Sequence, residues 1–259
     1  MSKEKDLGIQ HILSSKNIPI FGIASIGTYK QPQADEFSPL FLLPNSKSLL
    51  CYGIPIPRGI IHAGFNNTLL YWRFCSMTYR RLDTVANLLC VHLEEEGFIS
   101  TPIYSCYPWK VKNRKFWGLV PLVYWAEQAG VGKLTKCGLL GHKKYGTRLL
   151  MGGVITTREF SPTKNIQQDI CPSECDECIN ACPAKAIDSS GKVDHNLCIR
   201  YANSNPLMTQ LLKNNEIREQ FDFETIMNTV GVEDHSEYRC FTCLKVCPLN
   251  KVGFKLTNS

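Results

Sequence analysis

Apolar residues in the N-terminal part of the chain follow helical and strand-like spacings in turn. A helix is expected over residues 3–15, where Ile9, Ile12 and Leu13 keep helical spacing. Short apolar runs bounded by turn residues predict extended segments, at residues 18–26, 48–54, 98–107 and 149–156. Helices and strands that alternate in this way indicate a layered domain containing both.

Two further segments have the periodicity of longer helices. One covers residues 71–96 and ends at Gly97, and the other covers residues 119–129 with Gly130 as its cap. Residues 58–73 combine glycine, asparagine and aromatic residues, which suits a loop that closes over a ligand. We therefore expect an α/β (α+β) domain over residues 1–163, followed over residues 164–259 by a cysteine-rich module with short helices.

Cysteine is the residue whose distribution changes this picture most. The chain of 259 residues has 13 cysteines, an odd number that disfavours a fully paired disulfide framework. Five are scattered and are expected in the core, namely Cys51, Cys75, Cys90, Cys106 and Cys137. The other eight gather near the C-terminus: Cys171, Cys175, Cys178, Cys182, Cys198, Cys240, Cys243 and Cys247. Such density in a reducing compartment points to metal or redox chemistry.

Two of the cysteine runs end in the pattern C-x2-C-x3-C-P, which is typical of ferredoxins with two 4Fe-4S clusters. In those proteins the cysteine before the proline binds the other cluster. The rule predicts one ligand set of Cys171, Cys175, Cys178 and Cys247, and it adds Cys182 to Cys240 and Cys243 in the second. The second set needs one more thiolate, and Cys198 is the cysteine left in this region. Three residues separate Cys171 from Cys175 where the usual run has two, so Cys171 departs from the pattern. Zinc is the alternative for paired C-x2-C, but zinc sites do not require the x3-C-P ending.

The formal net charge of +6 first suggests a nucleic-acid partner. Two oxidised clusters with their thiolates would lower that charge by about 4, so the basic residues offset the cofactors. The first 16 residues lack the apolar core of a secretory signal, and no apolar run is long enough for a membrane span. We therefore expect a cytoplasmic protein of an anaerobe with no membrane partner.

Several stretches of sequence resemble the epoxyqueuosine reductases and, more distantly, the reductive dehalogenases. They include "LLPNSKSLLCYGIPIP", "AEQAGVGKLTKCGLLGHKKYGTRLLMGGVITT" and both cysteine runs. The resemblance implies a nitroreductase-like domain that binds cobalamin or another corrinoid, followed by a two-cluster ferredoxin-like module. The residues that it implies as cofactor contacts are Gly130, Gly132, Lys133, Leu139, Tyr145, Gly146 and Arg148. Glycines let the backbone approach a large planar ligand.

Two features depart from that family. The acidic residue expected as the proton donor is replaced by Phe116 and Trp117, and no repeat-helix extension follows the second cysteine run. Tyr104, Tyr107 and His142 are the remaining candidates for proton donor, because they fall in expected loops near the cofactor.

The resemblance and the cysteines together predict a corrinoid-dependent iron-sulfur reductase. In this hypothesis a ferredoxin or flavodoxin supplies electrons, two 4Fe-4S clusters carry them to cobalt, and a small or modified substrate is reduced. The alternative is an electron-transfer activator that reduces the corrinoid or flavin of a partner protein, which the missing acid favours. FMN is the alternative cofactor of the N-terminal domain, and tRNA ranks below a small molecule as substrate.

Overall fold

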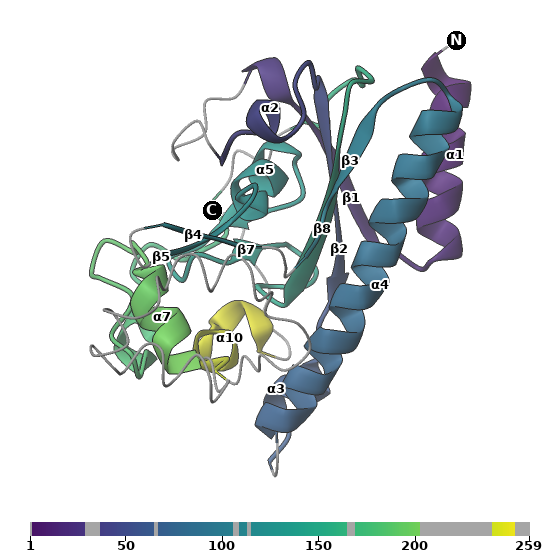
Figure 1. Cartoon of the computed structure of the whole chain (residues 1–259). Coiled ribbons are helices and arrows are strands. Elements are labelled where there is room, and N and C mark those ends of the chain that lie inside the picture. Colours follow the sequence, from purple (N-terminus) through teal and green to yellow (C-terminus); the bar gives the residue numbers. More distant parts are fainter. Residues whose placement is uncertain are drawn as a thin grey trace, which may run out of the picture.

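The computed structural model describes residues 2–28, 37–64, 67–105, 109–112, 115–164, 169–202 and 240–251. Its centre is a four-stranded antiparallel sheet with the order β1-β2-β8-β3 (Figure 1). The strands are β1 (Ile20–Ser25), β2 (Ser48–Pro55), β8 (Leu149–Thr156) and β3 (Ser100–Ile103). The expected strands are confirmed, and their antiparallel pairing makes the domain α+β.

Strand β2 shows why the sheet is central, because it is buried along nearly its whole length. Its residues alternate between the two faces, so Leu50 and Tyr52 pack into one apolar cluster while Leu49 and Cys51 pack into another. A strand with water on one face would alternate apolar and polar residues. The continuous apolar run therefore reflects a sheet that is covered on both sides.

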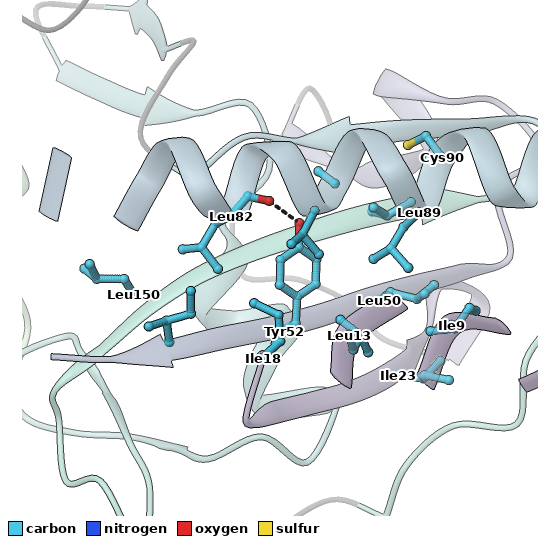
Figure 2. Close-up of a cluster of buried hydrophobic side chains, with 14 of the residues drawn as sticks. Ile9, Leu13, Ile18, Ile23, Leu50, Tyr52, Leu82, Leu89, Cys90 and Leu150 are labelled. Atoms are coloured by element: carbon cyan, nitrogen blue, oxygen red, sulfur yellow. Dashed lines mark hydrogen bonds between the residues drawn. The ribbon is translucent and has the colours of Figure 1, made fainter. Parts of the chain in front are cut away.

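Helices α1 (Ser2–Ser15) and α4 (Asn67–Glu95) cover one face of the sheet (Figure 1). Their apolar residues surround Tyr52, whose buried hydroxyl donates a hydrogen bond of 2.9 Å to the carbonyl oxygen of Leu82 (Figure 2). A buried hydroxyl needs such a partner. Helix α4 ends at Glu95, and Gly97 just beyond it has a φ of +86°, which suits glycine after a helix C-terminus.

The opposite face is covered by α5 (Leu122–Gln128), which buries Trp125 and Ala126 against the sheet. Gly130, with φ +69°, ends this helix as predicted. The N–H of Val131 donates to the carbonyl of Ala126 and the N–H of Gly130 to that of Glu127, which is a Schellman ending. The short helix α2 (Pro39–Leu42) begins at Ser38, whose hydroxyl accepts from the N–H of Leu40.

The loop expected over residues 58–73 is a wrong prediction. Its first part is helix α3 (Arg58–His62), and residues from Asn67 onward belong to α4. Short elements complete this part of the chain: η1 (Ile26–Thr28), β4 (Trp109–Lys112), β5 (Lys115–Gly118), β6 (Lys133–Leu134) and β7 (Leu140–Gly141). Phe116 and Trp117 therefore lie on β5, and Tyr107 lies outside the described residues.

Where the structure describes the cysteine-rich part, over residues 169–202 and 240–251, its helices are short, as its composition predicted. They are α6 (Glu177–Ala181), α7 (His195–Ala202), α10 (Thr242–Val246) and η4 (Pro248–Asn250). Helix α10 packs against α6 and also contacts α3, so the two cysteine runs lie beside each other and beside the sheet domain. In the described part of the chain, no helix is long and apolar enough to cross a membrane.

Candidate metal centre

The two C-x2-C-x3-C-P runs have the same local structure. Cys178 lies within α6 and Cys182 caps its C-terminus, while Cys243 lies within α10 and Cys247 caps that helix. A proline follows each capping cysteine and prevents the helix from continuing. Each run therefore has one thiol inside a helical turn and one at the end of that turn, where the chain leaves the helix.

The thiols of the first predicted set lie close enough to influence one another. Hydrogen bonding with Cys137 raises the pKa of Cys178, and burial and the charges of Cys171 and Cys247 raise it further. Burial raises the pKa of Cys171, and the charge of Cys175 raises it further. The pKa of Cys247 rises to about 11, mainly through burial and also through Cys171. These neighbours link Cys171, Cys175, Cys178 and Cys247.

The second predicted set is linked in the same way. Cys198 is exposed as a residue, yet protein atoms crowd its thiol. That desolvation, with the nearby Cys240 and Cys182, raises the pKa of Cys198 to about 11. The pKa of Cys243 is raised by a hydrogen bond with Cys137, by burial and by the charges of Cys198 and Cys240. Thiolates this close together repel one another, and the positively charged iron of a bound cluster would relieve that repulsion.

Backbone N–H groups point at several of these sulfurs. The N–H of Ala186 donates to Cys182 Sγ at 3.4 Å, that of Lys136 to the thiol of Cys171, and that of Leu249 to the thiol of Cys247. Hydrogen bonds to cluster sulfurs are one of the factors that set reduction potentials in iron-sulfur proteins. These three N–H groups can donate to iron-bound thiolates as well as to free thiols.

Cys137 lies among the predicted ligands, a position that the sequence did not reveal. It is buried, as expected of a core cysteine, but its neighbours are Cys178, Cys182 and Cys243 rather than the sheet. Side-chain hydrogen bonds connect it to Cys178 and to Cys243. The nearest signal in the sequence is its place within the glycine-rich segment, between Lys136 and Gly138.

The glycine-rich segment contacts the cysteine loops directly. Lys136 Nζ donates to the carbonyls of Ser173 (2.6 Å) and Cys175 (3.0 Å) and pairs with the carboxylate of Asp176 at 3.0 Å. Hydrogen bonding to Asp176 raises the pKa of Lys136, so the amine keeps its proton. Lys136 therefore holds the loop that carries the first two cysteines of the first run.

Asn250 makes the corresponding connection to the second run. Its fully buried amide accepts from the N–H of Thr147 at 3.0 Å, and donates to the Thr147 hydroxyl at 2.9 Å and the Leu244 carbonyl at 2.8 Å. Gly146, with φ +60°, leaves no room for a side chain, because an added Cβ would lie 2.2 Å from Asn250 Oδ1. This glycine lets the second run dock against the sheet domain.

A cavity of about 350 Å³ lies between the sheet and the cysteine module. Tyr71 of α4 and Leu244 of α10 both line it, and the Tyr71 ring stacks on Phe241 with centroids 4.7 Å apart. Burial, with contributions from Cys75, Cys243 and Cys240, raises the pKa of Tyr71 well above its usual value. The cavity therefore adjoins the second cysteine set. Its other walls are mainly apolar and include Tyr79, Tyr104, Val120, Leu139, Leu149 and Met151.

Only some of the sequence-predicted contacts face this cavity. Leu139 and Tyr104 line it, and the hydroxyl of Tyr104 donates to Asn87 Oδ1 at 3.0 Å. His142 instead stacks near Tyr145, and its Nδ1 accepts from the N–H of Lys144. Burial lowers the pKa of His142.

Four predicted contacts have a role within the chain. An added Cβ at Gly130 would lie 2.3 Å from the carbonyl oxygen of Lys164, and one at Gly132 would lie 2.3 Å from that of Gly141. Close approach by the protein's own backbone thus accounts for both glycines. Arg148 is buried and donates to the carbonyl of Ile56, while its Nε has no partner among the described residues. Lys133 pairs with Glu127 at 3.4 Å.

The chemistry of the donors fits iron-sulfur clusters. Each set offers four thiols, the usual ligand number for a 4Fe-4S cluster. Among the residues that the structure describes, no three His, Cys, Asp or Glu side chains converge on one point as ligands of a single ion do. The four ligands of a cubane bind four different irons at its corners, so their sulfurs need not converge.

Comparison with known proteins gives matches in sequence and in structure. Residues 170–250 match a family described as a 4Fe-4S double cluster binding domain. The epoxyqueuosine reductases of Listeria monocytogenes and Bacillus subtilis are 30% and 32% identical over 126 residues, which is 49% of this chain. The chain spans 28% of the length of each of these relatives.

Solved structures share the fold across nearly the whole chain. Epoxyqueuosine reductase of Streptococcus thermophilus has a TM-score of 0.61 at 17% identity, covering 98% of this chain and 68% of its own. An epoxyqueuosine reductase bound to a modified tRNA stem loop scores 0.61 at 19% identity, with 96% and 66% covered. A reductive dehalogenase described as B12-dependent scores 0.61 at 16% identity, with 96% and 32% covered.

Proposed function

We propose that this chain, a homologue of the epoxyqueuosine reductases with a 4Fe-4S double cluster binding domain, is an iron-sulfur oxidoreductase. In this proposal two clusters pass electrons to a cofactor in the cavity, where a substrate is reduced. The observation that carries it is the separation of eight thiols into two neighbouring groups, one of which adjoins the cavity.

The proposed ligand sets cross between the two cysteine runs. Cys171, Cys175, Cys178 and Cys247 hold one cluster, and Cys182, Cys198, Cys240 and Cys243 hold the other. The pKa effects support this pairing, because the cysteine charges that raise the pKa values of Cys171, Cys178 and Cys247 come from the first group or from Cys137, and those that raise the pKa values of Cys198 and Cys243 come from the second group or from Cys137. The matching helix-capping positions of Cys182 and Cys247 also support the crossing.

The cavity is the proposed end of the electron path. Leu244 follows Cys243 directly in the chain and lines the cavity, so the second cluster would lie within side-chain distance of a ligand bound there. A ferredoxin or flavodoxin would supply the two electrons one at a time, and water would supply the protons. The apolar walls would exclude bulk water from the reacting groups.

A corrinoid is the proposed cofactor, because a reductive dehalogenase with the same fold is described as B12-dependent. When bound, a corrinoid supplies a low-potential cobalt centre that can react with an organic substrate. The chain would contact the ring edge with Leu139, Leu149 and the tyrosines of the cavity. At about 350 Å³, the cavity is at the small end of ligand sites and would accept the reacting part of the cofactor and a small substrate. FMN is the alternative.

Tyr104 is the proposed proton donor. Of the candidates whose surroundings the structure describes, it lines the cavity and His142 does not. Its hydroxyl donates to Asn87 Oδ1 at 3.0 Å, and it would have to exchange this partner for the substrate when it donates the proton. A phenol can donate a proton to a reduced substrate that is more basic than itself.

Two other functions are supported by particular observations. The absence of an acid at Phe116 and Trp117 favours an activator that reduces a partner's corrinoid or flavin without its own substrate. The relative bound to a tRNA stem loop favours RNA as the substrate class. Activity only with a partner protein would identify an activator, and binding of a tRNA stem loop that weakens steeply with salt would identify an RNA substrate.

Cofactor retention tests the proposal. Anaerobically reconstituted protein is mixed with hydroxocobalamin or FMN, passed through gel filtration and examined by absorption spectroscopy. We expect cobalamin to be retained at one per chain, and Val123→Trp, which fills the cavity wall, to abolish retention. Tyr124→Trp changes the neighbouring residue of α5, which is not part of the wall, and serves as the control. Retention of FMN instead of cobalamin, or equal retention by Val123→Trp, would contradict the proposed cofactor site.

A further inference from the structure

Cys137 lies at the tip of a tight hairpin that enters the cysteine module. Strands β6 and β7 are joined by residues 135–139, and the N–H of Gly138 donates to the carbonyl of Thr135 at 2.9 Å. Gly138 has φ +73°, a conformation that most residues avoid, so the turn depends on it. The tip is surrounded by apolar side chains of the module, Ile179, Ile187, Val193 and Val246.

Two groups of its own hairpin fix the sulfur of Cys137 in position. The hydroxyl of Thr135 lies 3.2 Å from it and itself donates to the carbonyl of Leu139 at 2.8 Å. The backbone N–H of Leu139 donates to the sulfur. Only 8% of the residue is exposed. A buried cysteine with no function needs no such set of partners, since the weakly polar S–H is tolerated in apolar cores.

The same sulfur touches one thiol from each of the two proposed ligand sets. Side-chain hydrogen bonds join it to Cys178 of the first set and to Cys243 of the second. The other described cysteines outside the sets, Cys51, Cys75 and Cys90, lie in the apolar layers of the sheet domain. Cys137 therefore occupies the position between the clusters.

We propose that Cys137 is a positioning residue whose single S–H proton is shared between the iron-bound sulfurs of Cys178 and Cys243 in a three-centre hydrogen bond, and so sets the reduction potentials of both clusters together. This inference rests on the proposed function, because it requires both clusters. Cys137 is not a ligand in this account, since each set already has four thiols. An iron-bound thiolate has no proton, so at both contacts it can only accept.

The expected consequence is electrostatic. Reduction adds negative charge to a cluster, and a hydrogen bond to its sulfur stabilises that charge, which raises the potential. The N–H groups of Lys136 and Leu249 point at one thiol each, Cys171 and Cys247, both in the first set. Cys137 differs because a single substitution there should shift both clusters in the same direction.

Redox titration followed by EPR tests the inference on the reconstituted full chain. Cys137→Ala should keep the wild-type iron content and show both midpoint potentials below wild type. Cys137→Ser, which retains a donor, should show both at or above wild type. Cys90→Ala is the matched control, since Cys90 is 7% exposed and remote from the module, and it should leave both potentials unchanged.

Each failure has a distinct meaning. Unshifted potentials in Cys137→Ala, or a shift of one cluster alone, would overturn the shared role of Cys137. Loss of half the iron would make it a ligand and would also overturn the inference. If Cys137→Ala does not fold, Cys137→Ser decides, because potentials well below wild type would exclude the hydrogen bond. A wild-type protein without iron would instead refute the proposed function.

Discussion

The ammonium group of Lys136 lies 3.0 Å from the carboxylate of Asp176 and joins the glycine-rich segment to the first cysteine loop. The same ammonium donates to the carbonyls of Ser173 and Cys175. A single side chain thereby closes the loop that presents Cys171 and Cys175. The sheet domain contributes in this way to holding ligands that lie on a different part of the chain.

Replacement of Lys136 by methionine should weaken the first cluster. The loop from Cys171 to Asp176 loses three interactions, so the cluster it carries should dissociate sooner. We expect about half of the iron, the share of one cluster of two, to pass to a chelator several-fold faster than in wild type. Lys47→Met removes an exposed ion pair with Glu159 and is the control. Identical rates of iron release from Lys136→Met and wild type would show that the contacts of Lys136 do not help to hold the cluster.

Asn250→Leu should destabilise the fold. The substitution keeps the branching of the side chain at Cγ but leaves the buried N–H of Thr147 and carbonyl of Leu244 without their partner. Each unsatisfied group costs about 1 to 3 kcal/mol, so a loss of about 2 to 6 kcal/mol is expected. Anaerobic urea denaturation measures it. Asn87→Leu, at an exposed position on α4, should change the unfolding free energy by less than about 1 kcal/mol. If Asn250→Leu also lowered the unfolding free energy by less than about 1 kcal/mol, the role of the buried amide would be contradicted.

Asp83→Asn should stabilise the protein near neutral pH. Burial raises the pKa of Asp83, although the N–H of Ser105 donates to its carboxylate at 2.9 Å. A carboxyl whose folded pKa is above its unfolded pKa costs stability once the pH exceeds the folded value. The advantage of asparagine should therefore be largest near pH 8 and shrink as the pH falls toward the raised pKa of the wild-type carboxyl.

The difference in urea midpoint between variant and wild type, measured at several pH values, checks this dependence. Asp188→Asn provides a control of opposite sign, because hydrogen bonds from Ser190 and the N–H of Lys192 lower the pKa of Asp188. It should destabilise the protein near neutral pH, and the effect should fade in acid. A pH-independent difference for Asp83→Asn would contradict a raised pKa.

Much of the fold could be predicted from the spacing of apolar residues. The run over β2 and the helical period around Leu82, Val85 and Leu89 both identify elements that are buried on a long face. The error at residues 58–73 has a physical reason. Glycine and asparagine favour turns, but packing of Ile61 and Tyr71 into the core makes both ends of this segment helical.

For the candidate site, spacing predicts the proposed ligands but not their surroundings. The x3-C-P endings predict which cysteines cross between runs, because the capping turn is local. The hairpin places Cys137 against residues more than 40 positions away in the sequence. The spacing of apolar residues does not predict such a contact. Glycines at positions 132 and 146 likewise suggested a ligand, whereas the space beside them is filled by Gly141, Leu249 and Asn250.

Iron and acid-labile sulfide analysis of anaerobically reconstituted protein tests the central claim most directly, namely two clusters held by eight cysteines. Wild type should contain about eight iron atoms per chain, and Cys198→Ser about four, with Cys51→Ser unchanged as the remote control. Zinc without sulfide in wild type, or an iron content in Cys198→Ser equal to wild type, would contradict the account.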